Sequence, residues 1–283
     1  MRVKLGKRET IKPGKHMPFE FLPNKKKAVI SMAHIGALPG SPLYAADGGI
    51  DKLIEDVIGD IEKLQDGGVD AIMFGNENDR PYLLEASTES IAAMTAVVMA
   101  AKPCLKVPFG VNYLWDPAAS VAIAVATGAL WVREIMTGVF ASDMGVWAPS
   151  AAEASRMKVN LRREDLKFFF NINAEFAHSL DQRPIGLRAK SAVFSSLADA
   201  ILVSGPITGE PADQSNLEEA VKAVEGNVPV LANTGVNIHN VAEVMKVASG
   251  CIIGTHFKLD GNTWNQVDGD RVKRFMDIVD GLR

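Results

Sequence analysis

The feature that most constrains this chain is a regular alternation of short apolar runs with segments of helical periodicity. Eight such runs, each of four or five residues, recur along the 283 residues. They lie at residues 28–32, 71–74, 109–112, 129–133, 168–172, 200–203, 228–232 and 250–253. Between them, apolar positions such as Ile50, Leu53, Ile54 and Val57 recur at helical spacing. Strands that alternate with helices predict a parallel sheet, and continuously apolar strands predict burial on both faces.

Such a sheet can close into a barrel or stay open and doubly wound. An open sheet normally begins with a glycine-rich turn after its first strand, whereas this loop reads Ala33-His34-Ile35-Gly36-Ala37. No GxGxxG motif occurs in the chain. We therefore expect an α/β fold of the (β/α)8 TIM-barrel class, formed by residues 28–283 as a single domain.

Residues 1–27 differ from the remainder in charge. They carry nine Lys or Arg against two Glu, so their net charge is +7 and the rest of the chain has −11. They lack the apolar core of a signal peptide. We interpret them as a basic N-terminal arm. It either packs under the barrel or on a partner subunit, or it contacts an anionic surface.

Charge, hydropathy and cysteine content argue against a nucleic-acid partner, a membrane span and a disulfide. The overall charge of −4 gives no reason to expect a nucleic-acid partner, and no apolar run reaches the ~18 residues of a membrane span. The two cysteines, Cys104 and Cys251, have no metal-ligand spacing, which favours a reducing compartment without a disulfide. We expect a cytoplasmic protein that forms a homo-oligomer.

Two glycine-bearing turns follow the last two predicted strands. In a TIM barrel these loops often bind phosphate, because backbone N–H groups at a glycine turn or helix N-terminus hold a dianion without a lysine. The alternative is that the glycines only end their strands. The pattern predicts a phosphate site made of Ser204, Gly205, Asn233, Gly235, Gly254 and Thr255.

Polar or ionisable side chains follow seven of the strands, at the end where a barrel has its active site. The candidate catalytic residues among them are His34, Glu77, Asp79, Asn112 and Arg133. A histidine and a carboxylate can exchange protons with a substrate, and an amide and a guanidinium can orient it or stabilise negative charge. The structural alternatives are a core histidine and solvated loop carboxylates.

The same groups allow a second interpretation. No cofactor is required by the sequence, but His34, Glu77, Asp79 and Glu134 could converge on Mg²⁺, Mn²⁺ or Zn²⁺.

Lysine placement argues against one familiar barrel mechanism. A Schiff-base aldolase needs a lysine inside the barrel mouth. Lys106 precedes the third strand, Lys167 begins the fifth, and we expect Lys258 to face solvent or the anion. A Schiff-base aldolase is therefore disfavoured.

The segment 134–165 is much longer than the usual connection from a strand to a helix. Asp143 and Trp147 within it are candidates for a lid over the barrel mouth. The alternative is a contact between subunits.

Several strings in the chain resemble the BtpA/SgcQ family. The most specific is His34-Ile35-Gly36-Ala37-Leu38-Pro39-Gly40-Ser41-Pro42. Others are Glu77-Asn78-Asp79-Arg80-Pro81, Gly110-Val111-Asn112 and Gly205-Pro206-Ile207-Thr208-Gly209-Glu210-Pro211, followed by residues 233–236 and 253–255. The resemblance implies a TIM barrel of the ribulose-phosphate-binding type. One family member is implicated in photosystem I biogenesis and another is encoded among sugar-uptake genes, so peripheral membrane association is also implied as an option.

These observations predict an enzyme that acts on a small phosphorylated metabolite, either a sugar phosphate or a nucleotide-like compound. Isomerase or lyase chemistry is favoured because no redox motif or nucleophile is evident. The alternative function is a non-catalytic assembly or stability factor, similar to a photosystem I biogenesis protein, that keeps a vestigial anion pocket.

Overall fold

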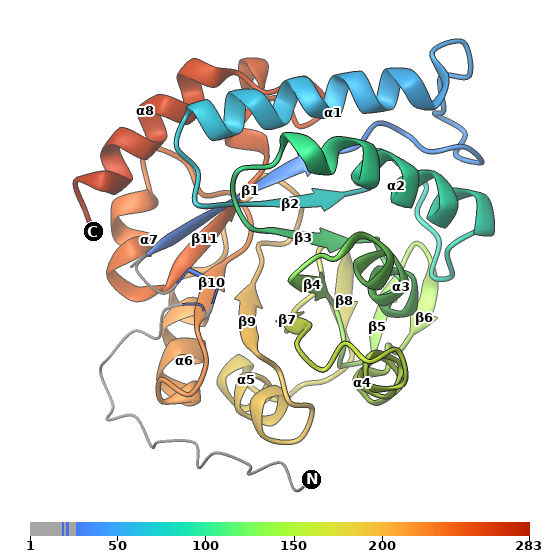
Figure 1. Cartoon of the computed structure of the whole chain (residues 1–283). Helices are drawn as coiled ribbons and strands as arrows, with labels where there is room; N and C mark the ends of the chain where they lie inside the picture. Colours follow the sequence, from blue (N-terminus) through green and yellow to red (C-terminus); the bar gives the residue numbers. More distant parts are fainter. Residues whose placement is uncertain (1–18, 20, 23–26) are drawn as a thin grey trace, which may run out of the picture.

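The computed structural model describes residues 19, 21–22 and 27–283, and these form a closed barrel of eight parallel strands (Figure 1). The strands are β1 (Ala28–His34), β2 (Ala71–Gly75), β3 (Phe109–Asn112), β4 (Trp131–Glu134), β7 (Lys167–Asn171), β9 (Ala200–Val203), β10 (Val230–Ala232) and β11 (Gly250–Ile253). Their order around the barrel is β1-β11-β10-β9-β7-β4-β3-β2. The TIM-barrel prediction is confirmed, and each predicted strand is present.

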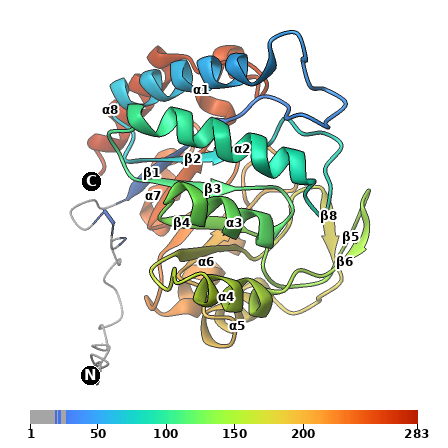
Figure 2. The same ribbon diagram turned by 45° about the vertical axis from the view of Figure 1, so that its right-hand side comes forward.

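Helices follow the strands along the chain and cover the outside of the barrel (Figures 1 and 2). They are α1 (Gly49–Asp66), α2 (Thr88–Ala101), α3 (Pro117–Thr127), α4 (Ala151–Asn160), α5 (Ile185–Phe194), α6 (Gln214–Val224), α7 (Val241–Val247) and α8 (Gly269–Asp280), with 3₁₀ turns η1 (Lys102–Cys104), η2 (Thr255–Phe257) and η3 (Leu259–Gly261). Local chemistry sets their ends. At α3, the Asp116 carboxylate accepts hydrogen bonds from the first-turn N–H groups, and Gly128 ends the helix in the left-handed region.

The long segment 134–165 is more ordered than its sequence suggests. It contains a hairpin of β5 (Phe140–Ser142) and β6 (Gly145–Trp147), and then α4. A third strand, β8 (Ala177–Ser179), comes from the connection after β7 and pairs antiparallel with β5. Figures 1 and 2 show this small sheet beyond the carboxyl ends of the barrel strands. The segment lacks a clear periodic signal because its strands have only three residues each.

Side chains alternate along the barrel strands, and one phase of this alternation fills the barrel interior. In β1, Ala28, Ile30 and Met32 belong to the interior cluster, whereas Val29 and Ala33 pack with the helices. Residues of the same phase from β2, β4, β7, β9, β10 and β11 join that cluster. Since successive strand residues face opposite sides, the next residue of the interior phase in β1 is His34, at the carboxyl end.

Aromatic rings close the amino-terminal end of the barrel. The Phe21 ring stacks on Trp131 with centroids 4.7 Å apart, and the Phe19 ring lies 5.4 Å from that of Phe169. These few described residues of the predicted arm pack against the barrel. Its other residues, 1–18, 20 and 23–26, lie outside the described residues.

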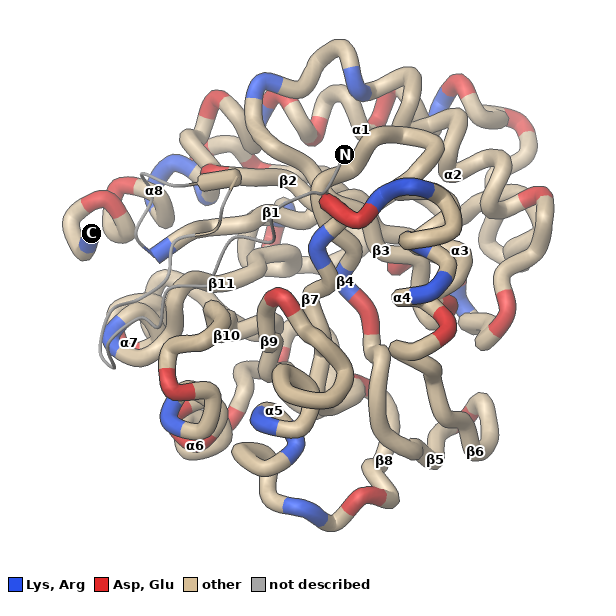
Figure 3. The backbone as a smooth tube through the Cα atoms, turned by 60° about the horizontal axis from the view of Figure 1, so that its bottom comes forward, with Lys and Arg blue, Asp and Glu red and all other residues tan. Residues whose placement is uncertain are grey.

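Charged residues lie mostly on the outer helices and loops, and the barrel strands carry few of them (Figure 3). Within the described part of the chain, no helix combines the length and apolar character needed to cross a bilayer. Both cysteines are free, and Cys251 is buried in β11, as expected of a core residue.

Candidate active site

A small cavity of about 40 Å³ lies at the carboxyl ends of the barrel strands. Three of the five candidate catalytic residues line it, namely His34, Glu77 and Arg133. The remaining lining residues come mainly from the loops around the mouth: Met32, Tyr82, Leu114, Trp115, Glu175, Phe176, Thr208, Gly209, Asn233, Thr234, Gly235, Gly254 and Thr255. This volume has room for only a few water molecules. The central cavity is therefore a narrow site between these loops.

His34 and Glu77 are buried neighbours in the lining of this cavity. The distance between His34 Nε2 and Glu77 Oε2 is 3.7 Å. Burial, followed by the positive charges of Lys258 and Arg133, lowers the pKa of His34 to about 3. Burial also raises the pKa of Glu77, although Arg133 opposes that shift. At neutral pH the imidazole is therefore neutral, and the carboxylate is a stronger base than it would be in water.

Two glycines make room for this pair. A Cβ on Gly75 would collide with the Glu77 carboxylate, and one on Gly254 would lie 3.0 Å from His34 Cε1. Gly254 therefore lets the imidazole approach the β11 backbone.

Arg133 anchors the opposite wall of the cavity through a chain of hydrogen bonds. Its Nη1 donates to Asn233 Oδ1 at 3.3 Å, and Asn233 Nδ2 donates to Glu175 Oε1 at 3.2 Å. Thr208 Oγ1 donates to the other oxygen of Glu175 at 2.8 Å. Burial raises the pKa of Glu175, and the charge of Arg133 opposes the rise. The positive charge of Arg133 thus acts on both carboxyl groups, Glu77 and Glu175, and Arg133 forms the positive side of the site.

Glu175 is the most important residue that was not among the candidates. It lies four residues beyond β7, in a loop whose polar composition looks ordinary. Its contacts with Asn233 and Thr208 arise from other loops, so local sequence carries no signal for them. His178, three residues further on, lies in β8 and is exposed.

Two of the candidate catalytic residues, Asp79 and Asn112, lie outside this cavity lining. Asp79 Oδ1 accepts a hydrogen bond from Leu38 N at 2.6 Å, and Oδ2 accepts one from Asn76 Nδ2 at 3.2 Å. Its carboxylate therefore holds the loop after β1 against the loop after β2. The Asn112 Nδ2 group donates to Arg133 O at 2.8 Å and to Glu134 Oε1 at 2.5 Å. It therefore supports the backbone and carboxylate of β4.

Glu134 is fully buried beside the site, and burial raises its pKa to about 8. The nearby charge of Arg133 and the hydrogen bonds from Ile135 N and Asn112 Nδ2 oppose this rise. Between about pH 4.5 and 8 the folded state then holds a proton on this carboxyl that the unfolded state has lost. Stability attributable to Glu134 is fully present below pH 4.5 and declines as the pH rises to 8.

We expect Glu134→Gln to remove this pH dependence. The free energy of unfolding of the variant, relative to that of the wild type, should increase between pH 5 and pH 8, as measured by urea denaturation. A lost hydrogen bond to Ile135 N would shift the variant equally at every pH. Parallel pH profiles for the two proteins would contradict the expectation.

A second cavity, of about 150 Å³, lies between the loops after β10 and β11. Three of the predicted phosphate-binding residues line it, namely Gly235, Gly254 and Thr255. Arg271 of α8 also contributes to its lining, which no strand-end pattern could reveal. The cavity shares the three predicted residues and Gly209 with the central cavity, so the two are neighbours.

The other predicted phosphate residues have different surroundings. Asn233 lines the central cavity, and its Nδ2 donates to Ser204 Oγ at 2.9 Å. The space beside Gly205 is filled by the backbone of Glu210 and Pro211, which a Cβ would strike. The same backbone approaches Gly235, whose φ of 64° also favours glycine. Both glycines therefore allow the loop after β9 to pack tightly, and Gly235 still borders the open cavity.

The two lid candidates occupy the small sheet. Asp143 is exposed at the hairpin turn, whereas Trp147 is buried, with its ring 4.8 Å from Phe140 and 5.9 Å from Trp115. Trp115 in turn lines the central cavity. Trp147 thus supports a wall of the site from behind, and its role as part of a lid stays a prediction.

The position of Lys258, after β11, contradicts the expectation that this side chain faces solvent or the bound anion. Lys258 is instead buried, and its Nζ lies 2.8 Å from Asp60 Oδ2 on α1.

Among the described residues, no group of three or more His, Cys, Asp or Glu side chains is placed to hold a metal ion. His34 and Glu77 approach each other, while Asp79 and Glu134 have the separate partners given above.

Comparison with known proteins identifies the family of this barrel. The BtpA family model matches residues 25–281. The sgc region protein SgcQ of Escherichia coli (strain K12) is 44% identical over 258 residues, covering 91% of this chain and 96% of the relative. The photosystem I biogenesis protein BtpA of Synechocystis is 30% identical, covering 90% and 89%.

Solved structures share the fold at low sequence identity. The thiamine phosphate pyrophosphorylase of Pyrococcus furiosus has a TM-score of 0.56 and 15% identity, covering 92% of this chain and 98% of its own. The phosphoribosyl anthranilate isomerase of Thermus thermophilus has a TM-score of 0.56 and 12% identity, covering 90% and 100%. These structural likenesses show only a shared barrel fold. The family model, in contrast, matches the sequence over residues 25–281, and we conclude that the chain belongs to the BtpA family.

Proposed function

We propose that the protein is an enzyme that acts on a small phosphorylated metabolite, a sugar phosphate or a nucleotide-like compound. The observation that carries this proposal is the adjacency of two cavities. The cavity between the β10 and β11 loops borders the cavity that holds His34, Glu77 and Arg133, and they share Gly235, Gly254 and Thr255. A phosphate in the first would place the attached carbon skeleton over the second.

The side chains support proton transfer at carbon. Glu77, with a raised pKa, would take a proton from a carbon next to a carbonyl or hydroxyl group. Negative charge that develops on the substrate oxygen would be stabilised by Arg133. The neutral His34, 3.7 Å from Glu77, would donate or accept a hydrogen bond at the same oxygen. Returning the proton to a neighbouring atom gives an isomerase, and expelling a leaving group gives a lyase.

The names of two fold neighbours are consistent with this proposal. Thiamine phosphate pyrophosphorylase and phosphoribosyl anthranilate isomerase both carry a phosphorylated compound in their names. Because their sequence identities to this chain are 15% and 12%, they support a suitable barrel and specify no substrate.

We expect at least one phosphorylated sugar or nucleotide to raise the melting temperature of the purified protein, because a ligand at 100 times its Kd stabilises the folded state by about 2.7 kcal/mol. The unphosphorylated form of the same compound should give no comparable rise. The measurement is a thermal-shift screen of phosphorylated compounds, each paired with its unphosphorylated parent. If no phosphorylated compound stabilises the protein, or each pair shifts the melting temperature equally, the proposal fails.

The alternative function is a non-catalytic assembly or stability factor with a vestigial anion pocket. It is favoured by the small volume of the central cavity, about 40 Å³, and by the name of the Synechocystis relative, a photosystem I biogenesis protein. Stabilisation by orthophosphate without turnover of any phosphorylated compound would support it.

A homo-oligomer, a cytoplasmic location and a bound divalent metal stay predictions. Light scattering, cell fractionation and elemental analysis of the purified protein test them respectively.

A further inference from the structure

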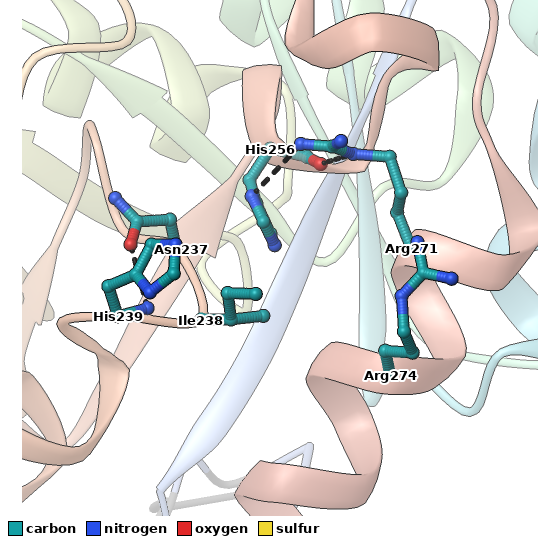
Figure 4. A pocket seen from close by; sticks show the side chains of 6 residues that line it. All are labelled: Asn237, Ile238, His239, His256, Arg271 and Arg274. Carbon is teal, nitrogen blue, oxygen red and sulfur yellow. Dashed lines mark hydrogen bonds between the residues drawn. The ribbon is translucent and has the colours of Figure 1, made fainter.

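A third and larger cavity, of about 340 Å³, lies on the outer side of the cavity between the β10 and β11 loops. Figure 4 shows its walls: the turn before α7 on one side, α8 on the other, and the η2 turn between them. Its lining consists of Asn237, Ile238, His239, His256, Arg271 and Arg274. We call it the outer pocket. It shares Asn237, His256 and Arg271 with the cavity between the loops, so the two are contiguous.

The lining of the outer pocket is basic. Two of its six residues are arginines, two are histidines, and none carries a carboxylate. The effect is visible on His256, because burial and the positive charges of Arg271, His239 and Arg274 lower its pKa to about 4. These groups are close enough to act on one another, and an anion placed among them would offset their repulsion.

One hydrogen-bond donor in this pocket lacks an acceptor. The Nε of Arg271 donates to His256 O at 2.7 Å, and its Nη2 lies 3.4 Å from His256 Nδ1. Since a guanidinium can only donate, Nδ1 is the acceptor, and the neutral ring carries its proton on Nε2. That Nε2 atom is buried and has no partner among the described residues. Figure 4 shows the tip of the ring pointing into the space between the two walls.

We propose that the outer pocket binds a second phosphate group of the ligand whose first phosphate occupies the neighbouring cavity. The substrate would then be a diphosphate or bisphosphate rather than a monophosphate. This inference rests on the proposed function for the first phosphate. The His256 N–H and the guanidinium groups of Arg271 and Arg274 supply donors for the second, and charge-assisted bonds of this kind are the stronger ones.

The test compares inorganic orthophosphate with inorganic tripolyphosphate by isothermal titration calorimetry on the full chain at fixed ionic strength. We expect tripolyphosphate to bind at least tenfold more tightly than orthophosphate, because it can reach both cavities. Arg274→Gln should remove about tenfold of the tripolyphosphate affinity and leave the affinity of orthophosphate for the first site unchanged, since Arg274 does not line that cavity. Lys273→Gln is the matched control, because it removes the same charge from the adjacent exposed position of α8 and Lys273 does not line the pocket.

The outcomes separate the two proposals. If tripolyphosphate binds no more tightly than orthophosphate, or if both variants weaken it equally, the outer pocket is not a phosphate site, and the first phosphate site stands. If orthophosphate does not bind but tripolyphosphate keeps its dependence on Arg274, the proposed first site is wrong and the outer pocket stands. If neither anion binds, both are wrong.

Discussion

Replacing Lys258 by methionine is expected to lower the free energy of unfolding by about 3–5 kcal/mol, because it leaves a buried carboxylate without its partner. Lys258 Nζ lies 2.8 Å from Asp60 Oδ2, and the exposed fractions of the two side chains are 2% and 6%. The other oxygen of Asp60 accepts a hydrogen bond from Val267 N at 2.7 Å. In the variant, that single N–H would be the only hydrogen-bond donor left to the carboxylate among the described residues. Thermal unfolding should show a loss of roughly 10 °C.

A surface ion pair on α1, the helix that carries Asp60, provides the control. Lys52 Nζ lies 2.6 Å from Asp56 Oδ1, but the exposed fractions of these side chains are 52% and 36%. Lys52→Met should therefore cost far less than Lys258→Met, because solvent screens an exposed ion pair. Adding Asp60→Asn to Lys258→Met should recover much of the loss, because the amide oxygen can still accept from Val267 N without carrying a buried charge. Equal losses for Lys258→Met and Lys52→Met would show that burial does not govern the effect.

The Lys258–Asp60 pair also shows what the sequence could not reveal. The apolar periodicity of 50–64 predicted the helix α1 correctly, and the alternation of strands and helices predicted the barrel. Asp60 and Lys258 are nevertheless 198 positions apart, and only closure of the barrel brings α1 beside the segment after β11. A sequence pattern therefore suggests a solvated lysine where the fold contains a buried ion pair.

The same distinction applies to the candidate site. His34 and Arg133 could be predicted because each continues the interior phase of a strand, so the backbone alone directs it to the mouth. Asp79 and Glu175 could not be ranked, because each lies in a loop. The hydrogen bond from Leu38 N holds Asp79 away from the cavity, whereas those from Asn233 and Thr208 hold Glu175 in its lining. The glycine turns predicted residues that line the cavity between the β10 and β11 loops, but not the tight approach of residues 210–211 to Gly205 and Gly235.

Glu77→Gln is expected to reduce kcat/KM by about 10²- to 10⁴-fold with the substrate found in the phosphate screen, because an amide cannot take the proton. Phosphate-dependent thermal stabilisation should be retained, since Glu77 does not line the cavity between the β10 and β11 loops. The variant should also be at least as stable as the wild type at pH 8. Burial raises the pKa of Glu77, so ionising this carboxyl is unfavourable in the folded state, and a neutral glutamine avoids that penalty.

Asp79→Asn is the matched control for Glu77→Gln, since it changes the same kind of group two positions further along the same loop. Asp79 does not line the central cavity, and Asn can still accept from Leu38 N, so kcat/KM should stay within a few-fold of the wild type while stability falls slightly. Together the variants separate catalysis from loop support. Glu77→Gln should lose turnover and keep its stability, whereas Asp79→Asn should keep turnover and lose some stability. Wild-type turnover by Glu77→Gln would exclude this carboxylate as the base. Glu175, which lines the opposite wall, would then be the carboxylate to examine.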